Sequence, residues 1–250
     1  MSKSNQKFLY YGHQSLDQTD LSWIKKALNS DWLTTGPFVE NFEARIAKYV
    51  GAKYAVACSN GTAALFLAYL SLFGFNSKKR VLMPSMTFTA TASAARIIGL
   101  DIDFVDCEKD TGLIDIDATK KQINRKKYDM IIPVHMNGNT ANLEEIKKLA
   151  KKNGIKVVDD ASHAIGSLYQ TKAGKVFKVG SCKHTDATTF SFHAVKNITT
   201  GEGGAVVTNN KQLYEKLINF RTHGINREKK KFKNTKYAYS NKGILNPWYY

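Results

Sequence analysis

Short apolar runs alternate with amphipathic segments along most of the 250-residue chain. The apolar runs are continuous, which is typical of strands buried on both faces of a parallel sheet. We expect strands at 54–58, 81–83, 102–105, 130–134 and 156–159, and two more that begin at Thr188 and Ala205. We expect helices over 16–29, 38–50, 89–98, 116–123, 142–153 and 211–221, and one that begins near Ala63. This order predicts an α/β fold whose mostly parallel sheet is covered by helices on both faces.

The net charge of the chain is +16, from 31 lysines and 6 arginines against 21 acidic residues. A basic surface could bind nucleic acid. However, base reading favours arginine and stacking needs clustered aromatic residues, whereas the lysines here are dispersed near predicted helix ends. We therefore expect anionic small molecules, and not nucleic acid, as partners.

The chain also lacks the sequence marks of export or membrane insertion. No run approaches the roughly 18 apolar residues that span a bilayer, and the first residues have no apolar signal-peptide core. The three cysteines are scattered, which favours a reducing compartment over a disulfide framework. These features predict a cytoplasmic protein that does not bind membranes.

Lys196 is the residue on which the functional prediction depends. It follows an apolar strand and precedes the Gly201–Gly204 turn, after which a second strand begins. A lysine held in such a loop can lie inside a cleft, and burial can lower its pKa until the amine forms a Schiff base with a carbonyl. The ordinary alternative is an exposed surface lysine, because most lysines are exposed.

Two features near strand ends are suited to an anion. In the turn 59–62, Gly61 would let backbone amides approach a phosphate at the start of a helix, where the helix dipole favours negative charge. The alternative is a helix N-cap without a ligand. Ser191, close before Lys196, could bind the same phosphate.

Two further features are suited to an aromatic ring. One of the adjacent carboxylates Asp159 and Asp160 can face a cleft and keep a pyridine nitrogen protonated, and Phe88 could stack on the ring or else belong to the core. Anion cradle, aromatic ring, carboxylate and lysine are together the parts that pyridoxal phosphate needs. Cys182 and His184 without further ligands are weak evidence for a metal, and we predict no metal site.

Five segments resemble the sugar aminotransferases of the DegT/DnrJ/EryC1/StrS family, which have the aspartate aminotransferase fold (fold type I). They lie at 59–65, 84–91, 133–138, 159–166 and 191–204. The resemblance covers nearly the whole chain, and it implies a pyridoxal 5'-phosphate enzyme with a large domain of this fold. A sugar dehydratase of the same fold would have a histidine in place of Lys196.

The resemblance also implies a role for each candidate residue. Lys196 would form the Schiff base and move protons, and Asp160 would pair with the pyridine nitrogen. Phe88 would stack on the ring, and His163 would lie near the phenolic oxygen. The phosphate would be bound by Gly61, Thr62 and Ser191. Ser162 stands where alanine is more usual, and we expect this difference to matter little. We expect replacement of Asp159 to be mild, since Asp160 is assigned to the ring.

Within the family, the segments 11–15, 220–225 and 247–250 are most similar to the enzymes of pseudaminic acid biosynthesis. This similarity implies a homodimer that transfers an amino group from glutamate to C4 of a UDP-linked 4-keto-6-deoxy sugar. The 4-amino-arabinose enzymes share several of these features, so they and other nucleotide-sugar aminotransferases remain alternatives.

The resemblance suggests three parts: an N-terminal arm and helix (1–35), a large cofactor-binding domain (36–226) and the start of a linker (227–250). Chains of the family are considerably longer, so we expect a fragment that lacks the small C-terminal domain. It would also lack an asparagine that reaches the neighbouring subunit's phosphate. Such a fragment would retain cofactor weakly and transaminate little; a non-catalytic remnant is the alternative.

Overall fold

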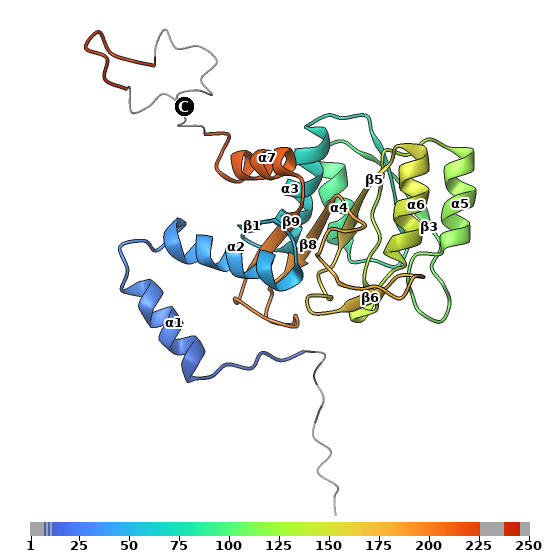
Figure 1. The fold of residues 1–250 in the computed structure, drawn as a ribbon, viewed down its shortest axis with the longest axis horizontal. Coiled ribbons are helices and arrows are strands. Elements are labelled where there is room, and N and C mark those ends of the chain that lie inside the picture. The colour runs from blue at the N-terminus through green and yellow to red at the C-terminus, as the bar shows by residue number, and fades with distance from the viewer. Residues whose placement is uncertain (1–7, 9, 11, 226–237, 246–250) are drawn as a thin grey trace, which may run out of the picture.

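One large mixed sheet organises the computed structural model, which describes residues 8, 10, 12–225 and 238–245 (Figure 1). The strands are β1 (Tyr54–Cys58), β2 (Arg80–Pro84), β3 (Asp101–Val105), β4 (Met130–Ile131), β5 (Lys156–Asp160), β6 (Leu168–Gln170), β7 (Val176–Lys178), β8 (Ala187–Ser191) and β9 (Gly204–Thr208). The helices are α1 (Gln18–Leu28), α2 (Gly36–Val50), α3 (Gly61–Phe73), α4 (Thr89–Ile97), α5 (Ile116–Arg125), α6 (Leu143–Asn153), α7 (Lys211–Arg221) and the 3-10 helix η1 (Met136–Gly138).

The sheet has seven strands in the order β1-β9-β8-β5-β4-β2-β3. Neighbouring strands from β3 to β8 are parallel, whereas β9 runs antiparallel to both β8 and β1. The prediction of a mostly parallel mixed sheet is therefore confirmed. Because β8 and β9 are antiparallel, a loop joins them, and this loop carries Lys196 to the edge where β1, β5 and β8 end.

Side chains that alternate along the strands form cores on both faces of the sheet. Val158 and Val206 pack with α3, α4 and α7, while Val157 and Val207 face the opposite side with α2 and α6. Successive residues of a strand point to opposite faces. The continuous apolar runs of the sequence are thus explained by helices on both sides, as Figure 1 shows.

The structure differs from the predicted elements at the end of β4 and in the hairpin of β6 and β7. The strand expected at 130–134 ends at Ile131, since Pro133 has no amide to donate, and Val134 rejoins β5 only through a single bridge to Asp160. The hairpin of β6 and β7 was not predicted, because its strands have only three residues each. Helix α1 has Asp17 as its N-cap, and none of its residues is buried.

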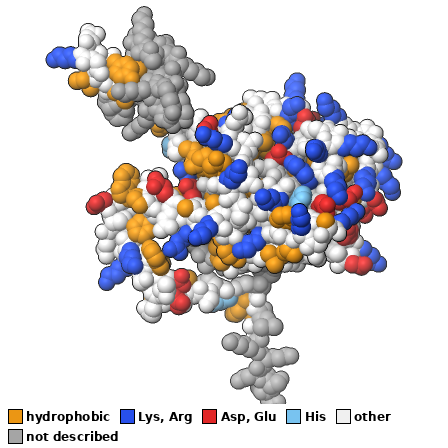
Figure 2. All heavy atoms as spheres, in the orientation of Figure 1, with side chains coloured by type: hydrophobic (Ala, Val, Ile, Leu, Met, Phe, Trp, Pro, Cys, Tyr) orange, Lys and Arg blue, Asp and Glu red, His pale blue; other side chains and the backbone are white. Residues whose placement is uncertain are grey.

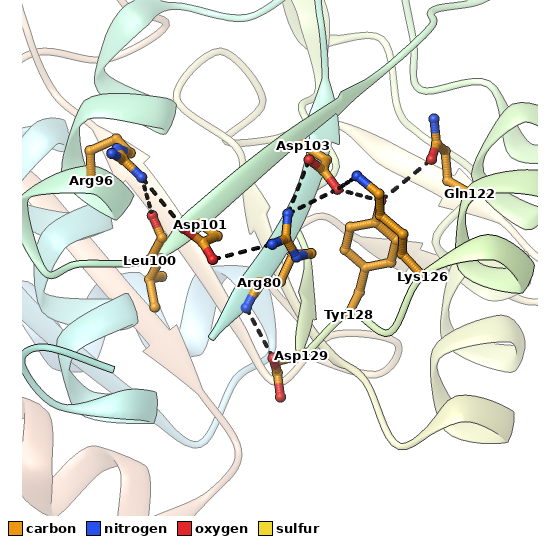
Figure 3. Close-up of polar contacts among 9 residues, drawn as sticks. All are labelled: Arg80, Arg96, Leu100, Asp101, Asp103, Gln122, Lys126, Tyr128 and Asp129. Carbon is orange, nitrogen blue, oxygen red and sulfur yellow. Dashed lines mark hydrogen bonds and ion pairs between the residues drawn. The ribbon is translucent and has the colours of Figure 1, made fainter. Parts of the chain in front are cut away.

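The amino-terminal edge of the sheet is joined by ion pairs (Figure 3). Arg80 contacts Asp101 and Asp103 at 3.3 Å each, so β2 is linked to its neighbour β3. Asp103 also accepts hydrogen bonds from Lys126 at 3.1 Å and Tyr128 at 2.8 Å. This network lies at the edge opposite to the ends of the parallel strands.

Figure 2 shows lysine and arginine side chains spread over this face of the molecule, with acidic side chains among them. In the part of the chain that is described, no helix is long and apolar enough to cross a membrane. Most of the predicted linker 227–250 lies outside the described residues, as do Tyr11 and the segment 247–250 used in the sequence comparison.

Substitution of Gly204 tests the close contact between β9 and the turn before α3. A Cβ atom at this position would overlap the carbonyl oxygen of Asn60, which is backbone and cannot rotate away. Gly204→Ala should therefore lower the free energy of unfolding by about 3 kcal/mol in urea denaturation. Gly154→Ala is the control: its Cβ would meet nothing within 4 Å, so only left-handed backbone strain of about 1 kcal/mol is expected. Equal losses would contradict the contact.

Candidate active site

A cavity of 630 Å³ opens at the edge of the sheet where β1, β5 and β8 end. This volume lies in the ordinary range for small-molecule sites. All seven residues predicted from the sequence line it: Gly61, Thr62, Phe88, Asp160, His163, Ser191 and Lys196. The structure therefore brings together in one cavity residues that are up to 135 positions apart in the sequence (196 − 61).

The start of α3, where we predicted an anion site, forms one end of this cavity. The side chain of Asn60 accepts a hydrogen bond from the amide of Ala63 at 2.8 Å, so the N-cap is Asn60. The amides of Gly61 and Thr62 belong to the first turn of the helix and have no acceptor within it. A Cβ atom on Gly61 would lie 2.7 Å from the Cβ of Ser191, so glycine is needed to let this serine approach. N-cap and anion cradle are thus compatible.

Asp160 is the carboxylate that faces the cavity, and only 5% of its surface is exposed. Oδ2 accepts a hydrogen bond from the Thr91 hydroxyl at 2.7 Å. Oδ1 accepts two from Ser162, one from the hydroxyl at 2.6 Å and one from the backbone amide at 3.1 Å. Sequence reasoning missed Thr91, although it lies in the segment 84–91 on which the family resemblance rests.

Lys196 lies in the loop between β8 and β9, where its backbone amide donates to the carbonyl of His193 at 2.9 Å. The side chain is half-buried, and this burial lowers the pKa of the amine, an effect that the charge of Asp160 partly opposes. Burial and then the charge of Lys196 lower the pKa of His163. Both shifts favour neutral, nucleophilic or proton-accepting side chains.

Phe88 caps the start of α4 and lines the cavity with 74% of its surface exposed. The alternative interpretation, that Phe88 is a core residue, is therefore wrong. An exposed ring at the rim of a cavity can stack on a planar ligand.

His135 and Asp159 form a buried pair that sequence reasoning missed. Nε2 of His135 lies 3.0 Å from Oδ2 of Asp159, and both side chains are fully buried. Because Nδ1 accepts from the amide of Ala141 at 3.1 Å, the proton is on Nε2 and is donated to Asp159. The backbone amide of His135 also donates to the carbonyl of Asp160 at 3.0 Å, so this pair supports the strand end that presents Asp160.

Among the described residues, no group of three or more potential metal ligands occurs. The Cys182 thiol lies 3.4 Å from the carbonyl oxygens of Gly180 and Val207, and burial raises its pKa to about 12. His184 shares a hydrogen bond with the hydroxyl of Tyr169 at 2.8 Å. Both side chains have hydrogen-bond partners within the protein.

Residues 14–243 match the DegT/DnrJ/EryC1/StrS aminotransferase family. The chain belongs to this family. It is similar to the UDP-4-amino-4,6-dideoxy-N-acetyl-beta-L-altrosamine transaminase of Campylobacter jejuni (strain 81-176), with 44% identity over 217 residues. This match covers 86% of the chain but 55% of the Campylobacter protein, so the chain spans about half the length of the curated relatives it matches.

Solved structures of the family confirm the fold of the large domain. The chain resembles Helicobacter pylori PseC, an aminotransferase involved in the biosynthesis of pseudoaminic acid, with a TM-score of 0.81 and 36% identity. This similarity covers 89% of the chain and 58% of PseC. The chain also resembles the PLP form of the putative sugar aminotransferase Spr1654 from Streptococcus pneumoniae, with a TM-score of 0.78 and 28% identity. This similarity covers 88% of the chain and 59% of Spr1654.

Asp159 should matter more than the sequence suggested, because its removal would leave the Nε2 proton of His135 buried without an acceptor. Asp159→Ala should lower the free energy of unfolding by about 1–3 kcal/mol, measured by urea denaturation. Asp117→Ala is the control, since that side chain is 83% exposed and its ion pair with Lys120 should contribute no more than about 0.5 kcal/mol. Equal effects would show that the His135 pair adds nothing.

Proposed function

We propose that this chain is the cofactor-binding part of a pyridoxal 5'-phosphate aminotransferase that acts on a nucleotide-linked keto sugar. The observation that carries the proposal is the placement of Lys196 and Asp160 in one cavity with the first turn of α3. The half-buried amine, the nearly buried carboxylate and the open helix amides suit the aldehyde, the ring nitrogen and the phosphate of that cofactor. The PLP form of Spr1654 supports the same cofactor.

Each of the predicted cavity residues has its own role in holding the cofactor or moving protons. When bound, pyridoxal phosphate supplies a ring that withdraws electrons from the carbon next to the amino nitrogen. Lys196, made less basic by burial, would capture the cofactor and then move a proton to or from the reacting carbon. Asp160 would hold the proton of the ring nitrogen, and Phe88 would cover one face of the ring. Ser191 would bind the phosphate beside Gly61 and Thr62, and His163 would lie near the phenolic oxygen.

The substrate is inferred from relatives. The names of the Campylobacter transaminase and of PseC support an acceptor of the pseudaminic acid pathway. We therefore propose a UDP-linked 4-keto-6-deoxy sugar as acceptor, glutamate as donor and C4 as the carbon that receives the amine. Lys196 disfavours a dehydratase, for which the family resemblance implies a histidine at this position.

The setting of the reaction is also a proposal. We propose a homodimer in the cytoplasm, and the division into an arm (1–35), a large domain (36–226) and a linker (227–250). The three cysteines form no disulfide, which supports a reducing compartment. Longer versions of the chain are the appropriate material for turnover assays, because the relatives are about twice as long as the matched region.

Lys196→Ala tests the cofactor assignment. After incubation with pyridoxal phosphate and reduction with borohydride, mass spectrometry should place the adduct on Lys196 in the parent and find none in the variant. The variant should remain folded, since the substitution shortens a half-buried side chain without opening an apolar cavity. Lys172→Ala is the matched control, because its exposed amine lies on the surface 3.4 Å from Glu145. An adduct on another lysine would overturn the assignment.

The pH dependence of adduct formation tests the electrostatics. The neutral amine is the nucleophile, and the pKa of Lys196 lies below the ordinary value of 10.5. At saturating cofactor, the rate of adduct formation should rise with pH and level off below that value. Asp160→Asn removes the charge that opposes the shift, so the midpoint of the profile should move to lower pH. Stopped-flow absorbance measures both profiles, and a midpoint that moves upward in the variant would contradict this arrangement.

A further inference from the structure

Asp160 is held by hydrogen-bond donors from two separate elements. Thr91, fully buried in α4, donates to Oδ2, and Ser162, in the loop after β5, donates to Oδ1 through both its hydroxyl and its amide. Hydrogen bonds from hydroxyls to a carboxylate are among the shorter and stronger ones in proteins. The 2.6 Å and 2.7 Å distances here fall in that class.

The direction of these bonds follows from the number of available protons. The Thr91 hydroxyl lies 2.7 Å from Asp160 and 2.8 Å from the hydroxyl of Thr87. An ionised carboxylate can only accept, so the single proton of Thr91 goes to Asp160. Thr87, which lines the cavity, must then donate to Thr91. The chain Thr87–Thr91–Asp160 therefore runs from the cavity wall to the carboxylate with every proton assigned.

The same inventory shows what remains for a ligand. A carboxylate offers about four acceptor positions, and three donors from Thr91 and Ser162 occupy three of them. Because the donors come from both sides, they oppose rotation of the carboxylate about its Cβ–Cγ bond. Asp160 lines the cavity, so one acceptor position of fixed orientation is left for a ring N–H.

We infer that Ser162 and Thr91 are positioning residues that hold the Asp160 carboxylate in the orientation needed to accept a hydrogen bond from the ring nitrogen of the cofactor. This inference rests on the proposed function and concerns a residue, Ser162, that we expected from the sequence to be unimportant. Alanine at 162 would keep the hydrogen bond from the backbone amide to Asp160 but lose the 2.6 Å hydrogen bond from the hydroxyl. The substitution therefore isolates the hydroxyl, and Thr91→Val isolates the second donor while its shape is retained.

The test compares two ligands that differ only at the ring nitrogen. Pyridoxal 5'-phosphate and its 1-deaza analogue, in which a C–H group replaces that nitrogen, are titrated into the parent chain by calorimetry. The affinity for pyridoxal 5'-phosphate divided by the affinity for the analogue reports the contact with Asp160, because the phosphate, the aldehyde and the ring shape are common to both. Damage to the fold or to the phosphate cradle weakens both ligands alike and leaves the ratio unchanged.

We expect Ser162→Ala and Thr91→Val each to lower this ratio on the order of tenfold, since each removes one hydrogen bond to a charged group. Ser162→Thr, which restores a hydroxyl, should recover most of the parent ratio. Ser167→Ala is the matched control: its hydroxyl donates to the Gly138 carbonyl at 2.8 Å, away from Asp160, so the ratio should stay at the parent value.

Three results would overturn the inference. An unchanged ratio in both Ser162→Ala and Thr91→Val would show that the donors do not position the carboxylate. An equal fall of the ratio in Ser167→Ala, whose hydroxyl does not contact Asp160, would show that the ratio does not report the hydrogen bonds of Thr91 and Ser162. A parent chain that binds the two ligands equally, or binds neither, would refute the proposed contact of Asp160 with the cofactor and the inference with it. The first two results are measured on variants, so they would overturn the inference alone.

Discussion

The pairing of β9 between β1 and β8 is the interaction on which the site depends. At the end of this three-strand unit, Gly204 pairs with Cys58 on one side and with Ser191 on the other. The pairing brings the start of α3 against Ser191, and the close contact of Gly61 with that serine follows. It also requires a loop between β8 and β9, which places Lys196 at the same edge. The two ends of the cavity, at the start of α3 and at Lys196, therefore both depend on the pairing of the same three strands.

The pleat of β5 separates the two carboxylates that are adjacent in the sequence. Asp160 faces the cavity and the α4 side, where Thr91 meets it, whereas Asp159 faces His135 on the other side of the strand. One carboxylate is thus available to a ligand and its neighbour supports the strand end. The backbone amide of His135 also donates a hydrogen bond to the carbonyl of Asp160. The buried pair of His135 and Asp159 therefore also fixes the backbone of the residue that faces the cavity.

Charge is distributed in keeping with this division of the sheet. At the amino-terminal edge, Arg80 and its acidic partners form a network that links β2 and β3 (Figure 3). At the opposite edge, Asp160, Lys196 and Glu202 line the cavity, and the pKa values of Lys196 and His163 are both lowered by burial. A net charge of +16 gives little guidance to the site, since most of the lysines that the structure describes are exposed.

The sequence by itself determined the α/β class, the place of most elements and the identity of the residues that meet in the cavity. It could do so because apolar runs, glycine turns and the segments shared with the family are local patterns. Only the tertiary structure decided that Asp159 pairs with His135, that Phe88 is exposed, and that Ser162 and Thr91 converge on the Asp160 carboxylate. Those contacts join residues as many as 69 positions apart, and their geometry is set by sheet register and helix packing, which local patterns do not record.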